Sequence, residues 1–448
     1  MNIRMLHIRS MVKFPRQPLF TAFAVAACAL LVQACGGSHS GSSSGTSNTS
    51  STTATAGNSV TVTVNGGISS SASIPNMVMT SVTVCTPSNG TCATIPNIQV
   101  DTGSTGLRIM ASVLNKYGLA LPAVTPSASG HSYQECLAFA DGTVWGSLAT
   151  ANMQMGSESA SGIVVQVIQD SQDSASVTGP ADPTACTNQG ADESSIAQFG
   201  ANGIIGVGLF IQDCGTSCAQ STSNNTYFDC TGTGSSAVCN SVRMPLAQQV
   251  SNPVASFAKD NNGVILKFAQ IANTGVATAT GTLTFGIGTQ SNNGLGSSAV
   301  LLVPDTGPVL GDFTATFQSM ALTGSFFDSG SGGLYFNDAN IPVCTSKAAL
   351  GYYCPGGASS SSSDLTQFSV PVAGTGSQTV NIAVQVENAQ YLFSYSNTTN
   401  VFNNLAAQAS SGLTSGTGTF DFGMPAFFGH TVYTGFENNA NGPYFAYQ

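Results

Sequence analysis

Two short segments of the sequence repeat a pattern of residues that is suited to acid–base chemistry. Residues 98–109 read IQVDTGSTGLRI and residues 325–336 read SFFDSGSGGLYF. Each places Asp, a hydroxyl residue, Gly and Ser after an apolar approach and then continues with Gly and Leu. An Asp that ends a strand in a tight glycine turn presents its carboxylate at the tip of a loop. The repeat therefore makes Asp101 and Asp328 candidate partners in one site.

The hydroxyl residues of these two loops suggest two supporting roles. Thr102 and Ser329 directly follow the Asp residues and can bond to the backbone of the opposite loop, which would lock the two loops together. Ser104 and Ser331 stand at the fourth position of each loop and can donate to the neighbouring Asp oxygen.

A pseudo-twofold arrangement of the two loops would give Asp101 and Asp328 complementary roles. If the carboxyl groups meet, repulsion between like charges keeps one proton between them. The ionised member then acts as a general base on a trapped water. The protonated member acts as a general acid, which polarises a carbonyl group and later protonates the leaving amine.

With these loops, the sequence resembles the pepsin-like aspartic proteases, whose mark is a D-[ST]-G loop in each of two lobes. That family places an apolar-apolar-Gly strand beneath each loop, and Gly203–Gly208 and Phe420–Gly423 fit these elements. Its flap hairpin corresponds to Leu137–Gly146. The resemblance implies an all-β, two-lobed double β-barrel with a pseudo-twofold repeat, few short helices and an inter-lobe cleft.

Two positions depart from the family pattern. Phe139 stands near the place of the flap tyrosine, so Trp145 or Tyr133 could take the role of that tyrosine. Arg108 replaces the aromatic residue that follows the first loop in pepsin-like enzymes. We treat Phe139 and Trp145 as flap or cleft candidates.

The chain is also similar to a bacterial family of uncharacterised exported proteins or lipoproteins. Its members carry a DTGSTGLR-type loop, a GIGTQSNN-type segment, here Gly286–Asn293, and a late G-[LM]-P-x-F-F segment, here Gly423–Phe428. This second resemblance implies export but no established activity.

The remaining sequence predicts the elements that position these loops. Short alternating runs between Gly, Asn, Pro and Ser indicate strands of a barrel or sandwich. The clearest strands are Ser59–Val64, Val78–Val84, Gly162–Ile168, Gly281–Phe285 and Thr379–Val386. We expect one helix over Met244–Ala258, interrupted by Pro253.

The amino end has the features of an export signal. Residues 1–17 are basic, and an uncharged apolar run from Leu19 to Ala34 is too short for a comfortable membrane span. The following Cys35-Gly36 resembles the bacterial lipobox, which implies lipidation of Cys35 and attachment to a membrane. By analogy with bacterial sorting, Gly36 suggests the outer membrane, facing the periplasm or the cell surface. An ordinary cleaved signal is the alternative.

These features divide the chain into four parts. We expect a lipoprotein signal over residues 1–35 and a disordered Gly/Ser/Thr tether over residues 36–59, whose composition cannot support a packed core. Residues 60–268 form the amino-terminal lobe with the first catalytic loop and the flap. Residues 269–448 form the carboxyl-terminal lobe with the second loop.

Ten further cysteines fit an oxidising compartment. Cys85 and Cys92 flank a turn and are expected to pair. We also expect pairing of Cys344 with Cys354, and of Cys136 with Cys186 by elimination. The remaining four allow three pairings, and the sequence does not choose between them: Cys214, Cys218, Cys230 and Cys239.

Composition excludes several other classes of function. Ten Lys and Arg against 20 Asp and Glu disfavour nucleic acid, whose phosphates require a basic surface. Beyond the tether, the histidines His131 and His430 show no metal-ligand spacing, and no G-x-S-x-G motif is present there. We expect no cofactor, no metal and a monomer. A third Asp-Thr-Gly at Asp305 is bracketed by prolines and is interpreted as a turn.

The sequence thus supports three hypotheses of function. The first is a membrane-tethered, extracytoplasmic aspartic-type endopeptidase that acts on peptide or protein substrates. The second is a catalytically inactive surface lipoprotein that binds peptide or glycan in the inter-lobe cleft. The third is an adhesin or structural lipoprotein, which the Ser/Thr-rich tether and the low charge suggest.

Overall fold

The computed structural model describes residues 57–69, 73–126, 130–170, 179–302, 311–395, 398–409 and 418–448. The predicted signal, Cys35 and most of the predicted tether lie outside these residues, as does Asp305. In the described part of the chain, no helix is long and apolar enough to cross a membrane.

The larger of two sheets has 16 strands and contains most of the first half of the chain. Its order is β11-β10-β5-β6-β7-β4-β9-β3-β2-β1-β13-β12-β22-β23-β14, with β8 paired to β6. Its strands from the first 241 residues are β1 (Ser59–Asn65), β2 (Met77–Cys85), β3 (Cys92–Asp101), β4 (Thr105–Met110), β5 (His131–Ala138), β6 (Gly142–Met155), β7 (Glu158–Ile168), β8 (Ala191–Asp192), β9 (Gly203–Val207), β10 (Tyr227–Thr231) and β11 (Val238–Ser241).

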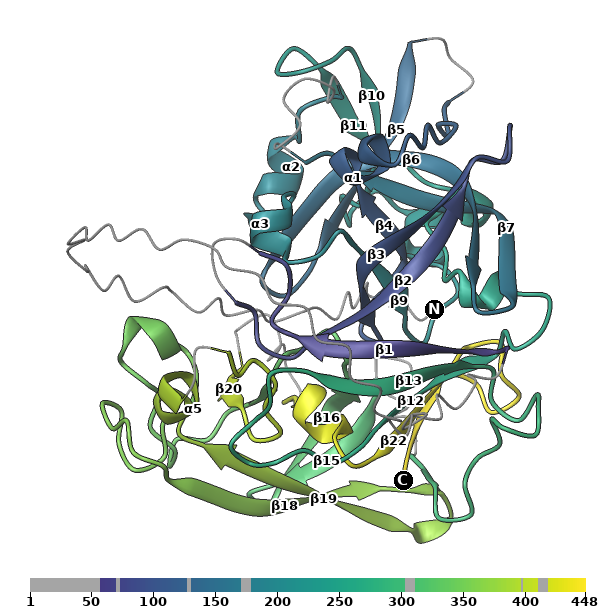
Figure 1. The fold of residues 1–448 in the computed structure, drawn as a ribbon. Helices are drawn as coiled ribbons and strands as arrows, with labels where there is room; N and C mark the ends of the chain where they lie inside the picture. Colours follow the sequence, from purple (N-terminus) through teal and green to yellow (C-terminus); the bar gives the residue numbers. More distant parts are fainter. Residues whose placement is uncertain are drawn as a thin grey trace, which may run out of the picture.

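The same sheet also contains strands from the second half of the chain. They are β12 (Gly263–Phe268), β13 (Ala279–Phe285), β14 (Val300–Leu301), β22 (Thr431–Gly435) and β23 (Tyr444–Tyr447). In Figure 1, β1, β13, β12 and β22 cross the middle of the molecule, between the strands of the first half and those of the second sheet. The expected lobe boundary after residue 268 falls between β12 and β13, which are antiparallel neighbours.

The smaller sheet has seven strands in the order β19-β18-β15-β16-β21-β17-β20. Its strands are β15 (Phe313–Phe317), β16 (Met320–Phe327), β17 (Leu334–Phe336), β18 (Leu365–Ala373), β19 (Thr379–Glu387), β20 (Ala406–Gln408) and β21 (Asp421–Phe422). The predicted all-β, two-lobed, pepsin-like fold with two barrel-like sheets is confirmed.

The strand predictions are confirmed because burial follows the pattern of the sequence. From Asn381 to Val384 in β19, exposed and buried side chains alternate: Asn381 and Ala383 are exposed, and Ile382 and Val384 are buried. This alternation is expected for a sheet with one covered face. By contrast, β4 and β9 are buried along their whole lengths, because each has strand neighbours in the middle of the larger sheet. The five predicted runs all lie within strands.

The helices are short. They are α1 (Ala111–Lys116), α2 (Thr184–Thr187), α3 (Ile196–Phe199), α4 (Thr216–Gln220) and α5 (Ala389–Tyr395), with 3-10 turns η1 (Leu246–Gln248), η2 (Val254–Ser256), η3 (Lys347–Ala349), η4 (Thr375–Ser377) and η5 (Met424–Phe427). The prediction of a helix over Met244–Ala258 is wrong. Pro245 and Pro253 lack a backbone N–H, and each precedes one short 3-10 turn. Residues 249–252, between the two turns, are extended or bent.

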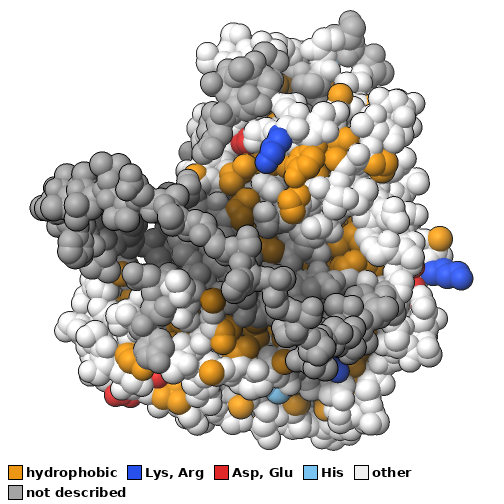
Figure 2. All heavy atoms as spheres, viewed as in Figure 1, with side chains coloured by type: hydrophobic (Ala, Val, Ile, Leu, Met, Phe, Trp, Pro, Cys, Tyr) orange, Lys and Arg blue, Asp and Glu red, His pale blue; other side chains and the backbone are white. Residues whose placement is uncertain are grey.

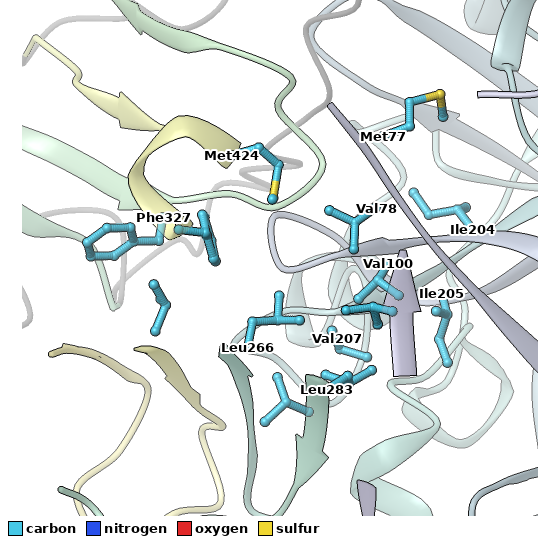
Figure 3. Close-up of a cluster of buried hydrophobic side chains, with 14 of the residues drawn as sticks. Met77, Val78, Val100, Ile204, Ile205, Val207, Leu266, Leu283, Phe327 and Met424 are labelled. Atoms are coloured by element: carbon cyan, nitrogen blue, oxygen red, sulfur yellow. The ribbon is translucent and has the colours of Figure 1, made fainter. Parts of the chain in front are cut away.

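A continuous hydrophobic core connects the two sheets beneath the predicted catalytic loops. Figure 3 labels the following side chains of this core, which come from both halves of the chain: Met77, Val78, Val100, Ile204, Ile205, Val207, Leu266, Leu283, Phe327 and Met424. Burying each such side chain stabilises the fold by about 1.5–3 kcal/mol. On the surface, the face drawn in Figure 2 carries few charged side chains, in keeping with the 7% of charged residues in the sequence.

Five disulfides link neighbouring segments. The predicted pairs Cys85–Cys92, Cys136–Cys186 and Cys344–Cys354 are confirmed. The structure also resolves the pairing that the sequence left open, because it joins Cys214 to Cys218 and Cys230 to Cys239. The last of these connects the facing residues of β10 and β11.

Candidate active site

The two predicted loops arise from the same arrangement of strands. Asp101 ends β3, which runs parallel to β9, and the returning β4 is antiparallel to β9. Asp328 follows β16, which runs parallel to β21, and the returning β17 is antiparallel to β21. Strands β9 and β21 are therefore the apolar-apolar-Gly elements that the sequence predicted.

The strand registers make the two halves equivalent residue by residue. Arg108 faces Ile204 across β4 and β9. Tyr335 faces Asp421 across β17 and β21. Arg108 and Tyr335 stand at the same place after their Asp-hydroxyl-Gly loops, so Ile204 and Asp421 are also equivalent. The backbone repeats, while these facing side chains differ.

The loops are joined by reciprocal hydrogen bonds. The N–H of Thr102 donates to Oγ of Ser329 at 3.1 Å, and the N–H of Ser329 donates to Oγ1 of Thr102 at 2.9 Å. The Ser329 hydroxyl then donates to the Val100 carbonyl at 2.9 Å, and the Thr102 hydroxyl donates to the Phe327 carbonyl at 3.4 Å. Each hydroxyl thus accepts an N–H from the opposite loop and donates to a carbonyl of that same opposite half.

Glycines let the two carboxyl groups approach one another. A Cβ atom on Gly103 would lie 2.6 Å from Oδ2 of Asp328. A Cβ atom on Gly330 would lie 2.5 Å from Oδ1 of Asp101 and 3.0 Å from Oδ1 of Asp328. Real Cβ atoms do not approach other atoms so closely, so each loop needs glycine to make room for the carboxylate of the other. The structure therefore brings Asp101 and Asp328 together.

The two carboxyl groups receive different hydrogen bonds. Oδ1 of each accepts the N–H of the glycine two residues later, Gly103 or Gly330, at 2.7 Å. Asp328 is also 3.0 Å from the Ser331 hydroxyl. Ser104, its counterpart in the first loop, makes no hydrogen bond of ordinary geometry to any described residue. Of the two hydroxyls, that of Ser331 is therefore the one in ordinary hydrogen-bond geometry to its Asp.

Burial and charge distinguish Asp101 further. Complete burial raises the pKa of Asp101 well above its usual value, and the charge of Asp328 raises it more. Contact with Ser104 and the N–H of Gly103 oppose this rise. Since two adjacent carboxyl groups share protons, the pair holds one proton into a higher pH range than a free Asp would.

Two residues near the pair of Asp101 and Asp328 were not predicted from the sequence as part of the site. Asp421 is fully buried, and its Oδ2 is 2.6 Å from the Ser331 hydroxyl. Tyr335 is also fully buried, and its pKa is raised well above its usual value by burial, with smaller contributions from Tyr352, Asp421, Asp141 and Asp328. An Asp inside the apolar run FDFG was the available signal for the first of these, and the match of Tyr335 to Arg108 in the repeat was the signal for the second.

The predicted flap is a hairpin formed by β5 and β6. Its turn residue Ala140 packs against a cluster of the second half that contains Tyr335. Phe139 packs on Phe199, with ring centroids 6.0 Å apart. Trp145 belongs to a different cluster, where its ring contacts Phe228 and its N–H donates to the Pro180 carbonyl at 2.9 Å.

Arg108 has a buried ionic environment of its own. Its Nη2 is 2.7 Å from Oε1 of Glu135 and 3.1 Å from Oδ2 of Asp213. The Tyr227 hydroxyl donates to Asp213 at 2.6 Å. Burial raises the pKa of Asp213, Glu135 raises it further, and Arg108 and Tyr227 oppose the rise. Arg108 therefore balances two buried acids below the first loop.

Metal ligands do not gather in the described residues, where no group of three or more His, Cys, Asp or Glu side chains could hold an ion.

Comparison with other proteins identifies the family of the chain. A family model described as "Protein of unknown function (DUF3443)" matches residues 54–447. The chain belongs to this family. A search of curated proteins finds no match. Among solved structures, an aspartic proteinase from Irpex lacteus is similar at 15% identity and a TM-score of 0.45, over 87% of this chain and 96% of that one.

Proposed function

We propose that this protein is an extracytoplasmic aspartic-type endopeptidase that hydrolyses peptide bonds with a water activated by Asp101 and Asp328. The observation that supports this most directly is the mutual fit of the two loops, in which each glycine makes room for the opposite carboxyl group. Reciprocal hydrogen bonds between Thr102 and Ser329 join the two loops, which supports a fixed placement of both carboxyl groups.

The proposed roles follow from the unequal surroundings of the two acids. Asp328 has two donors and acts as the ionised base, and it removes a proton from water as the oxygen attacks the carbonyl carbon. Asp101, with its raised pKa, supplies a proton to the carbonyl oxygen. When the tetrahedral intermediate collapses, Asp328 passes its proton to the leaving nitrogen. Asp101 recovers a proton from a hydroxyl group of the intermediate as the new carboxyl group forms.

The proposal is tested by removing each acid in turn. Asp101→Asn and Asp328→Asn should each lower kcat/KM for a fluorogenic peptide by roughly 10²- to 10⁴-fold while leaving the protein folded. Asp305→Asn changes the third Asp-Thr-Gly and should leave kcat/KM near that of the unchanged protein. Peptidase activity that survives both dyad changes would refute the mechanism.

A second candidate is non-catalytic binding of peptide or glycan between the lobes by a surface lipoprotein. The observation in its favour is that Asp101 and Asp328 are both fully buried while Ala140 of the flap turn packs against the second half. Saturable binding of peptide or glycan with no turnover from acidic to neutral pH would support this candidate. Turnover that either dyad change abolishes would exclude it.

We also propose that the protein is a monomer held outside the cytoplasm by a lipid on Cys35, at the outer membrane. The lipobox-like Cys35-Gly36 after an apolar run supports this anchoring. Cys35→Ala should abolish incorporation of labelled palmitate and move the protein from the membrane fraction to the soluble fraction. Unchanged labelling in that variant would refute the assignment.

A further inference from the structure

Ser331 lies between two carboxyl groups in the second half of the molecule. Its Oγ is 3.0 Å from Oδ2 of Asp328 and 2.6 Å from Oδ2 of Asp421. All three side chains are fully buried. A serine hydroxyl has one hydrogen, so it can donate to only one of these oxygens. The other contact is a hydrogen bond only if that carboxyl group is itself protonated and donates to Oγ.

Several features favour Asp421 as the protonated group. Oδ1 of Asp328 already accepts a backbone N–H of its own loop, so this carboxyl group is in place as an acceptor. Asp421 stands in β21 between Phe420 and Phe422, and complete burial disfavours a charge on it. With Asp101 and Asp328 nearby, a third ionised carboxyl group would add like-charge repulsion.

The strands on either side of β21 add no opposing charge to this arrangement. On β16, the residue that faces Asp421 is Phe326. On β17, the facing residue is Tyr335, whose buried phenol is electrostatically coupled to Asp421, to Asp328 and to Asp141 of the flap turn. The carboxyl groups among these neighbours favour the neutral form of Asp421, while the buried phenol of Tyr335, whose pKa is raised, stays neutral and adds no positive charge.

We propose that Asp421 is a positioning residue that remains protonated at neutral pH, donates to Ser331 and so holds the Ser331 hydroxyl as a donor to Asp328. This assignment rests on the proposed function for its effect on catalysis. It makes Asp328 the base of the pair. The first half has Ile204 at the equivalent strand position, so no such chain supports Asp101.

The protonation state can be measured without any catalytic activity. We expect the infrared difference spectrum of the full-length protein minus its Asp421→Asn variant, at neutral pH, to contain the C=O stretch of a protonated carboxyl group. The same band should be present when both proteins also carry Asp101→Asn and Asp328→Asn, which removes the proton of the dyad. A difference spectrum that contains the bands of an ionised carboxylate, and not the C=O stretch of the acid, would overturn the proposal.

The effect on catalysis separates positioning from simple packing. Asp421→Asn keeps a neutral donor to Ser331, so kcat/KM should stay within about threefold and the pH–rate profile should keep its position. Asp421→Ile copies Ile204 of the first half and removes the donor. We expect it, like Ser331→Ala, to lower activity about tenfold at the acidic end of the profile and less near neutral pH, because base support is lost.

The sign of the shift in Asp421→Asn is decisive. If Asp421 were ionised, its removal would delete a negative charge, and the acidic limb of the profile would move to lower pH; that result would overturn the proposal. If the unchanged protein has no peptidase activity, the endopeptidase proposal fails, while the infrared bands still decide the protonation of Asp421. Thermal unfolding of each variant shows whether it is folded.

Discussion

The two halves of the molecule present the same backbone around different side chains. In each half, a strand leads into an Asp-hydroxyl-Gly loop, a parallel strand lies beside it, and a returning strand is antiparallel to that neighbour. In the first half Arg108 faces Ile204, and in the second half Tyr335 faces Asp421.

This difference shows how a symmetric frame can hold two unlike acids. Backbone amides and glycines treat Asp101 and Asp328 alike, because strand pairing sets their positions. The side chains near the two acids differ between the halves. Ser331 connects Asp328 to a further acid, while Ser104 makes no such connection. One site can therefore contain a base and an acid of the same residue type.

The largest expected loss of stability comes from the ionic group of the first half. Arg108→Met leaves Glu135 and Asp213 buried without their cation, which costs about 3–5 kcal/mol of unfolding free energy at neutral pH. The pKa of Asp213 is raised even beside Arg108. In the Arg108→Met variant, the unfolding free energy should therefore fall as pH rises, and the loss caused by the substitution should be smaller in acid. Chemical denaturation at acidic and neutral pH measures this.

Two further substitutions serve as controls for Arg108→Met. Lys116→Met makes the same replacement at an exposed residue and should change stability by less than about 0.5 kcal/mol. Tyr335→Phe removes one hydroxyl at the equivalent position of the second half and should cost about 1 kcal/mol. An Arg108→Met variant as stable at neutral pH as the unchanged protein would contradict the assigned role.

The interlock between the loops should be symmetric and of intermediate size. Thr102→Val and Ser329→Ala each remove one acceptor of a buried N–H and one donor to a carbonyl, so each should cost about 1–3 kcal/mol. The double variant should lose less than the two single losses combined, because both act on the same interlock. Denaturant midpoints measure the cycle, with Thr102→Ser, which keeps the hydroxyl, as the control. Fully additive losses would show that the loops act independently.

A further expected effect is on the pH dependence of stability. A carboxyl group with a raised pKa in the folded state contributes stability that is present below the unfolded-state pKa and is lost as pH rises through the folded-state value. The unfolding free energy of the protein should therefore decrease as pH rises from acid towards neutral. Asp101→Asn should flatten this decrease by up to about 1.4 kcal/mol per pH unit.

The same substitution at an exposed carboxyl group serves as the control for the buried acid. Asp364→Asn changes an exposed carboxyl group and should leave the slope of unfolding free energy against pH unaltered. Thermal or denaturant unfolding at several pH values gives both slopes. A slope that is the same in Asp101→Asn and in the unchanged protein would contradict the shared-proton dyad.

Much of the fold followed from local patterns, and the exceptions have local causes. Alternating residues predicted β1, β2, β7, β13 and β19, because one covered face requires every second side chain to be apolar. The helix predicted over Met244–Ala258, with an interruption at Pro253, is wrong because Pro245 and Pro253 each precede only one short 3-10 turn.

For this protein, the sequence by itself determined the repeated loops, because Asp, hydroxyl and Gly in a fixed order are a local requirement of a tight turn that presents a carboxylate. Tertiary structure decided which groups meet across long separations: the loop interlock, the pairing of Cys214 with Cys218, the two acids around Arg108, and Asp421 at Ser331. The physical reason is that a carboxyl group acquires its proton and its partners from burial and from strand register, and neither is a property of its immediate neighbours along the chain.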